Sequence, residues 1–181
     1  MAQPPICNFG WKAPGFALKG VDGKTHTLKD VRGPKGALVL FICNHCPYVR
    51  SIADRLSEEA RALQALGFGV AAIMSNDTKN YPEDSFDNMK VFAKKHDFTF
   101  PYLIDETQDV SRAYDAVCTP DFFGFNAKDE LQYRGRLDES KTTLVKNARR
   151  DLYEAMKQVG ETEHGHKNQI PSMGCSIKWR D

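Results

Sequence analysis

Two cysteines separated by two residues, Cys43 and Cys46, form the motif Cys-Asn-His-Cys. Such a pair is suited to thiol–disulfide exchange, in which the thiolate rather than the thiol is the nucleophile. His45 stands between the two sulfurs in the sequence, and a protonated imidazole beside a thiolate lowers the pKa of that thiol. Cys43, His45 and Cys46 are therefore the candidate catalytic residues, and we expect Cys43 to be the nucleophile.

The segments on either side of this motif favour its reactivity. A continuous apolar run at 37–42 predicts a strand that is buried on both faces, and the motif follows it directly. From the second cysteine to Leu66, apolar residues recur every three or four positions, and Gly67 is a helix stop, which predicts one long amphipathic helix. Unpaired amides and the dipole at its start favour a thiolate, so we expect a lowered pKa for Cys43. Pro47 fits the first turn of this helix.

The other apolar segments predict further strands. A second apolar run at 68–74 gives the order strand, helix, strand of a parallel crossover. Segments 16–19 and 24–28 flank an Asp-Gly turn, and segments 121–126 and 130–135 flank another short turn, so both pairs are expected to form hairpins. The sequence therefore predicts an α/β fold with a mixed sheet and an N-terminal β-hairpin.

Three more helices are expected from apolar spacing: one capped by Ser85 and running to 93, one at 107–116 and one at 142–159. The last residues are rich in Gly, His, Asn, Pro and Ser and show no periodicity. We expect one domain over residues 1–160 and an extended C-terminal tail over 161–181 that packs on it.

Composition limits the partners and the compartment. The 25 basic and 24 acidic residues nearly cancel, so no global field favours nucleic acid or an anionic membrane. No apolar run is long enough to span a bilayer, and the first residues lack the features of a secretory signal. Five cysteines are an odd number, which argues against a structural disulfide framework. We expect a cytoplasmic monomer or homodimer that binds neither nucleic acid nor membranes.

The remaining cysteines and histidines give weaker signals. A zinc site needs about four ligands, and the cluster of His164, His166 and Cys175 has no second Cys-x-x-Cys. We therefore expect no metal and no organic cofactor. Cys175 has two interpretations: the tail docks through Ile177 and Trp179 and the thiol is incidental, or Cys175 is a third thiol that accepts the disulfide.

A second informative motif is Cys118-Thr119-Pro120, which stands just before a predicted strand. A peptide bond before proline can adopt the cis form, and such a segment can present a backbone edge to a substrate.

The order of strand, Cys-x-x-Cys, helix, strand and Thr-Pro resembles the thioredoxin superfamily over most of the chain. Within it, Ala13–Leu18 with Asp22-Gly23-Lys24 resembles the opening hairpin of the AhpC/TSA family, whose typical members have Asp where this chain has Gly15. A peroxiredoxin-related subfamily with the Cys-Asn-His-Cys-Pro-Tyr-Val motif is similar in these segments: Phe41–Val49, Ser75–Asp77, Tyr81–Asp84, Phe100–Asp105, Cys118–Asp121 and Gly174–Trp179.

The resemblance implies a thioredoxin-like fold, with a central sheet flanked by helices. It also implies that the loop holding Thr119 and Pro120 packs against the cysteine pair, with Pro120 cis and Cys118 close by as an additional redox candidate. Thr119, Pro120 and Asn44 are then the expected substrate-binding residues.

By the same resemblance, the protein is a thiol–disulfide oxidoreductase that acts on protein or small-molecule disulfides and thiols. Cys43 would attack a substrate disulfide, Cys46 would resolve the mixed disulfide, and the backbone beside Thr119 would align the incoming chain.

Two alternatives stay open. In a peroxiredoxin-like thiol peroxidase, Cys46, or else Cys43, would reduce hydroperoxides, and Cys46-Pro47 would match the peroxidatic Cys-Pro. The threonine that polarises the peroxide would then be replaced by Cys43, which could instead resolve the sulfenic acid, and Arg134 or Arg136 would supply the arginine. The other alternative is a non-enzymatic redox-sensing or binding module that uses the cysteine pair as a switch.

Overall fold

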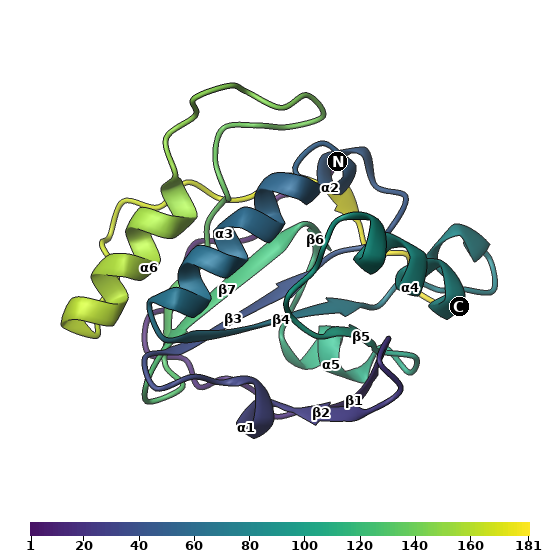
Figure 1. The fold of residues 1–181 in the computed structure, drawn as a ribbon, viewed down its shortest axis with the longest axis horizontal. Coiled ribbons are helices and arrows are strands. Elements are labelled where there is room, and N and C mark those ends of the chain that lie inside the picture. Colours follow the sequence, from purple (N-terminus) through teal and green to yellow (C-terminus); the bar gives the residue numbers. More distant parts are fainter.

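The strand that precedes the cysteine motif runs through the middle of the protein (Figure 1). In the computed structural model, which describes residues 1–181, β3 (Gly36–Phe41) is buried along its whole length. Leu38 and Leu40 belong to one hydrophobic core, and Val39 and Phe41 to a second core on the opposite face. Side chains alternate between the faces of a strand, so this distribution confirms the prediction of burial on both faces.

The sheet has both parallel and antiparallel strands, as predicted. β3 pairs antiparallel with β7, which pairs antiparallel with β8, while β4 pairs parallel with β5. On the far side, β5 pairs antiparallel with β1, and β1 forms the predicted N-terminal hairpin with β2. β3 and β4 are neighbours, and Ile42 N–H donates to the Ile73 carbonyl at 3.0 Å. These strands are β1 (Ala17–Gly20), β2 (Thr25–Thr27), β4 (Phe68–Met74), β5 (Tyr102–Ile104), β7 (Asp121–Asn126) and β8 (Leu131–Tyr133).

Helices cover both faces of the sheet (Figure 1). α3 and α6 lie on the face of the first core, to which they contribute Leu56 and Met156, and α1 and α5 lie on the other face. A separate two-stranded pair, β6 (Cys118–Thr119) with β9 (Cys175–Ser176), joins the tail to the domain. The helices are α1 (Leu28–Val31), α2 (Pro47–Arg50), α3 (Ala53–Ala65), α4 (Phe86–Lys95), α5 (Asp109–Ala113) and α6 (Asp151–Thr162), with a 3-10 turn, η1, at Pro82–Asp84.

The helix after the motif is interrupted, which corrects the prediction of one continuous helix. α2 ends at Arg50 and α3 begins at Ala53. Between them, the Ser51 hydroxyl lies within reach of the carbonyl oxygens of Tyr48 (3.3 Å) and Lys141 (2.5 Å). Side-chain hydrogen bonds of this kind compete with the regular helical ladder, and here they tie the break to a distant loop.

The predicted helix at 142–159 begins later, at Asp151, and the one at 107–116 is reduced to Asp109–Ala113. In the first case, the apolar side chains Leu144 and Val145 are exposed, at 43% and 36%. Helical spacing does not make a helix when its apolar side chains have no core to pack against. The helix capped by Ser85 is confirmed as α4, because its hydroxyl accepts the Asn88 N–H at 3.2 Å.

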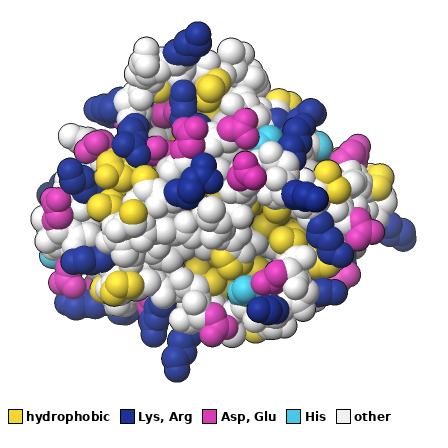
Figure 2. Space-filling model, in the orientation of Figure 1, with side chains coloured by type: hydrophobic (Ala, Val, Ile, Leu, Met, Phe, Trp, Pro, Cys, Tyr) yellow, Lys and Arg dark blue, Asp and Glu magenta, His cyan; other side chains and the backbone are white.

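Basic and acidic side chains are mixed on the visible surface. On the face shown in Figure 2, Lys and Arg side chains are interspersed with Asp and Glu. None of the helices combines the length and the apolar character that a bilayer crossing requires.

A buried ion pair fixes the start of β7, directly after Pro120. The Asp121 carboxylate is 0% exposed and accepts hydrogen bonds from Arg134 Nη2 and from Val117 N–H, both at 3.1 Å. Arg134 also lies over the Phe123 ring, 4.4 Å from its centroid. Burial raises the pKa of Asp121 and the Arg134 charge opposes that shift, so each buried charge depends on the other for compensation.

We predict that Asp121→Asn lowers the free energy of unfolding by about 3–5 kcal/mol, because it leaves the Arg134 charge buried and unpaired. Urea unfolding followed by circular dichroism measures the change. The matched control is Asp87→Asn, which removes a 92% exposed carboxylate paired with Lys90 and should change stability by less than about 0.5 kcal/mol. Equal effects of the two substitutions would contradict the structural role of the buried pair.

Candidate active site

The two cysteines of the motif lie between β3 and α2. Cys43 follows the carboxyl end of β3, and Cys46 is the N-cap residue of α2, with Pro47 at its first position. This placement confirms the predicted order of strand, cysteine pair and helix. Both side chains are buried, at 1% and 0% exposed, and both thiols are free.

Thr119 contacts both sulfurs. Cys43 Sγ lies 3.5 Å from Thr119 Oγ1, and the protonated Cys46 thiol donates to the Thr119 carbonyl oxygen at 3.2 Å. The Thr119–Pro120 peptide is cis, as the family resemblance implies. Cys118 is also buried here, but its thiol donates to the Pro120 carbonyl at 3.4 Å. The loop expected to bind substrate therefore packs directly on the cysteine pair.

The two thiols of the motif have opposite pKa shifts. The pKa of Cys43 is raised because its thiol is hydrogen-bonded to Cys46, because it is buried and because the Asp84 carboxylate is near. The pKa of Cys46 is lowered, chiefly by the hydrogen bond with Cys43 and further by Cys175 and Thr119, and these effects outweigh its burial. The expected lowering at Cys43 is therefore wrong. Cys46, rather than Cys43, is the residue at the helix N-terminus, where the helix dipole favours a thiolate.

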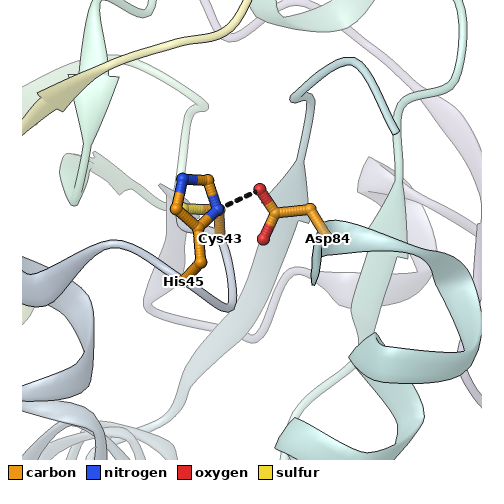
Figure 3. Close-up of side chains that lie close together, drawn as sticks. All are labelled: Cys43, His45 and Asp84. Atoms are coloured by element: carbon orange, nitrogen blue, oxygen red, sulfur yellow. Dashed lines mark hydrogen bonds and ion pairs between the residues drawn. The ribbon is translucent and has the colours of Figure 1, made fainter. Parts of the chain in front are cut away.

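A buried carboxylate organises the middle of the motif (Figure 3). Asp84 is 0% exposed and accepts hydrogen bonds from Asn44 N–H at 2.8 Å, His45 Nδ1 at 2.6 Å and Asn76 Nδ2 at 2.8 Å. The ring of Tyr81 stacks on that of His45, with centroids 5.9 Å apart. Because Nδ1 is held by a carboxylate, Nε2 is the nitrogen of His45 that is left to exchange protons.

Sequence reasoning did not assign a role to Asp84. It lies in a segment used for the family resemblance, but 39 residues separate it from the histidine that it binds. No local spacing reveals a contact of that range, and only the turn η1, which ends at Asp84, brings it to the motif.

Asn44 is held within the protein. Its side-chain oxygen accepts the Tyr102 hydroxyl proton at 2.8 Å, and its Nδ2 donates to the Glu83 carbonyl at 3.1 Å. These contacts fix the motif against β5 and η1. Substrate binding by Asn44 stays a prediction.

The same cluster also bears on metal binding. One ligand atom each from Cys43, His45 and Asp84 lies within 4.8 Å of the others, and they form the only such group of three. The carboxylate oxygens of Asp84 already receive three hydrogen bonds, so the arrangement is suited to orienting His45. His164, His166 and Cys175 are not brought together.

The tail brings Cys175 to the cysteine pair. β9 pairs antiparallel with β6, so that Cys175 is opposite Thr119, and Cys175 packs against the core that contains Cys43 and Cys46. Arg134 and Arg136, by contrast, are held by the carboxylates of Asp121 and Asp151, the second at 2.7 Å.

Comparisons with known proteins identify the family of the chain. The model of the AhpC/TSA family matches residues 9–135. The thioredoxin-like protein YneN of Bacillus subtilis is 27% identical over 128 residues, which is 68% of each chain. The thiol-disulfide oxidoreductase ResA of Geobacillus thermodenitrificans is 29% identical over 114 residues, or 63% of this chain and 61% of ResA. The match thus spans less than two thirds of ResA.

Solved structures show the same fold. An uncharacterized conserved protein from Geobacillus kaustophilus superposes with a TM-score of 0.91 at 40% identity, over 99% of this chain and 98% of that one. A hypothetical protein from Sinorhizobium meliloti gives 0.94 at 34% identity, over 99% of both chains. The thioredoxin domain of a Bacteroides vulgatus thiol-disulfide oxidoreductase gives 0.64 at 18% identity, over 83% of this chain and 96% of that one, and this likeness shows the thioredoxin-like fold.

We predict that the reduced protein forms its first thiolate at a pH below the value of about 8.5 that is usual for free cysteine. Ultraviolet absorbance of the thiolate against pH measures it. Cys46→Ser should remove this transition, and Cys43→Ala should move it to higher pH because the hydrogen-bond donor is lost, whereas Cys43→Ser keeps a donor. Cys7→Ser is the control, since burial raises the pKa of Cys7 to about 12. A transition that vanishes only in Cys43→Ser would place the thiolate on Cys43.

We also predict that Asp84→Asn lowers the free energy of unfolding by about 1–3 kcal/mol, because an amide at this buried position leaves at least one of the three donors without an acceptor. The His45 ring nitrogen signals in NMR should change as well, and the loss of the charge should lower the pKa of Cys43. Glu83→Gln, which changes an adjacent exposed carboxylate, is the matched control. An unchanged His45 spectrum would show that Asp84 does not orient the ring.

Proposed function

The chain belongs to the AhpC/TSA family, and on that basis we propose that it is a thiol–disulfide oxidoreductase whose redox pair is Cys43 and Cys46. The observation that carries the proposal is the shared contact of both sulfurs with Thr119, beside a thiol of lowered pKa. Relatives with the names thioredoxin-like protein and thiol-disulfide oxidoreductase support the same class of reaction.

In the proposed reaction, the Cys46 thiolate attacks one sulfur of a substrate disulfide and forms a mixed disulfide, and the other substrate sulfur leaves as a thiolate. Cys43 then loses its proton and attacks the Cys46 sulfur. The protein becomes a Cys43–Cys46 disulfide, and the substrate leaves with both sulfurs reduced. A dithiol protein or a small thiol restores the enzyme by the reverse steps. This order reverses the roles expected from the sequence, because the lowered pKa is that of Cys46.

His45 is proposed to act in the second step. Cys43 is a poor nucleophile while its pKa is raised, so a proton acceptor near it speeds the resolving attack. The His45 ring is partly exposed and is oriented by Asp84, with Nε2 free. The main chain at Thr119 is proposed to align a substrate chain beside the two sulfurs.

Peroxide reduction is a weaker candidate. The position of the peroxide-polarising threonine is occupied by Cys43, and Arg134 and Arg136 are neutralised by Asp121 and Asp151. With these groups engaged, little remains to stabilise the leaving oxygen of a hydroperoxide.

We predict that the protein accelerates the reduction of insulin disulfides by dithiothreitol, that Cys46→Ser lowers the rate to that of dithiothreitol alone, and that Cys43→Ser lowers it several-fold. Turbidity of the released insulin chains measures the rate. Cys7→Ser, on the opposite side of the sheet from the pair, should keep the wild-type rate. Full activity without either cysteine of the motif would refute the proposal. Rapid consumption of one thiol by one equivalent of hydrogen peroxide would instead support the peroxidase.

A further inference from the structure

The C-terminal strand occupies the edge to which the proposed function assigns a substrate chain. β9 forms a two-stranded antiparallel pair with β6, in which Thr119 is opposite Cys175 and Cys118 is opposite Ser176. Figure 1 shows the yellow strand of the tail beside β6. An extended segment added to a sheet edge is a common way to bind a peptide, since its main chain supplies affinity. Here that segment belongs to the protein itself.

Polar contacts hold the tail on both sides of Cys175. Before it, the Ser172 hydroxyl donates to the Pro120 carbonyl at 2.7 Å. After it, the main chain of Lys178 accepts a hydrogen bond from Gln108 Nε2 at 2.9 Å and donates to Asn76 Oδ1 at 2.9 Å. The path of the strand is thus fixed by side chains of the domain.

Gly174 allows the tail to come this close. A Cβ atom at this position would lie 2.0 Å from the Thr119 carbonyl oxygen, well inside van der Waals contact. The Gly174 main chain also exchanges hydrogen bonds with Ala2, at 2.7 and 3.1 Å. The tail strand is therefore enclosed between Thr119 and the N-terminal segment, and a larger residue at 174 would displace it.

This path places a third sulfur next to the redox pair. Cys175 packs against the core that contains Cys43 and Cys46, and it is partly exposed while they are buried. Cys175 stands opposite Thr119 in the β6–β9 pair, and the Thr119 carbonyl oxygen lies 3.2 Å from the Cys46 sulfur, so Thr119 brings the two cysteines together. Burial and the neighbouring Cys46 raise the pKa of Cys175 to about 11, and Cys175 in turn helps to lower the pKa of Cys46. Thiol–disulfide exchange needs such a neighbouring sulfur.

We propose that Cys175 is a third redox-active cysteine and that the tail acts as an internal substrate, accepting the disulfide through a Cys46–Cys175 bond. The inference rests on the proposed function of the Cys43–Cys46 pair. The Cys175 thiol loses its proton and attacks the Cys46 sulfur, the Cys46–Cys175 bond forms, and Cys43 leaves as a thiolate that takes up a proton. The protein as a whole is neither oxidised nor reduced in this step.

The exposed position of Cys175 then defines the external partner as a dithiol. One partner thiolate attacks the Cys175 sulfur and releases Cys46 as a thiolate. The second partner thiol attacks the mixed disulfide, leaves with its own disulfide, and returns Cys175 to a thiol. The partner loses two electrons and the protein gains them, so the pair is reduced without contact between the partner and the buried sulfurs.

The direct test uses Cys43→Ser, which leaves Cys46 without its partner in the motif. After mild oxidation with diamide and digestion under non-reducing conditions, mass spectrometry should find Cys46 linked to Cys175 as the main intramolecular disulfide. In Cys43→Ser with Gly174→Ala, the yield of this bond should fall several-fold, because the strand is displaced from Thr119. A Cys46–Cys118 bond, or Cys175 left reduced in both variants, would overturn the inference.

A kinetic test separates this inference from the proposed function. The oxidised wild-type protein is mixed with reduced thioredoxin as a protein dithiol, and recovery of the free thiols is followed with time. Cys175→Ser should slow this recovery at least tenfold, and Cys7→Ser should not change it. If the wild type forms a Cys43–Cys46 disulfide but Cys175→Ser recovers at the same rate, the relay fails and the proposed function stands. If no Cys43–Cys46 disulfide forms, the proposed function itself fails.

Discussion

The main chain at Thr119 is the constraint on which the site depends. Its carbonyl oxygen accepts the Cys46 thiol, its hydroxyl contacts Cys43, and its strand pairs with Cys175. Thr119 can hold this position because β7 begins two residues later, where the buried pair of Asp121 and Arg134 fixes the chain. The pairing of β7 with β3 then sets this loop beside the cysteine motif at the carboxyl end of β3. The geometry of the sulfurs is thus a property of the central sheet.

The two cysteines of the motif differ in their electrostatic surroundings, which shift their pKa values in opposite directions. Cys46 stands at the helix N-terminus with the thiols of Cys43 and Cys175 beside it, which lower its pKa, so negative charge is stabilised there. Cys43 lies deeper, and the buried carboxylate of Asp84 opposes a second negative charge beside it. One thiolate and one thiol are the state that disulfide exchange requires, since the first attacks and the second resolves. Asp84 has two roles here: it raises the pKa of Cys43, and it orients His45, which lies between the two cysteines in the sequence.

Local patterns in the sequence predicted most of the fold and part of the site. The apolar run of β3, the crossover to β4 and both hairpins follow from periodicity and turn residues, and these were correct. The errors arose where distant contacts decide the outcome. Segment 142–150 has helical spacing but no core for Leu144 and Val145, and the helix after the motif breaks where Ser51 meets the Lys141 carbonyl. Likewise, the role of Asp84 and the opposite shifts of the two thiols depend on neighbours remote in sequence.

The redox pair is buried, so an external partner cannot contact its sulfurs directly, whereas Cys175 of the tail is partly exposed. Attack on a disulfide requires three sulfurs nearly in line, and neither Cys43 nor Cys46 has the exposed surface that a folded partner would need to reach it. Displacement of the tail would expose them, but it would break the β6–β9 pairing together with the contacts of Ser172 and Lys178. Exchange through Cys175 avoids that cost when the pair is reduced, because the third sulfur already lies on the substrate edge and is partly exposed, whereas attack by Cys46 on a substrate disulfide requires the tail to move aside. The pairing of β9 with β6 therefore covers Cys43 and Cys46 and also places the partly exposed Cys175 beside them.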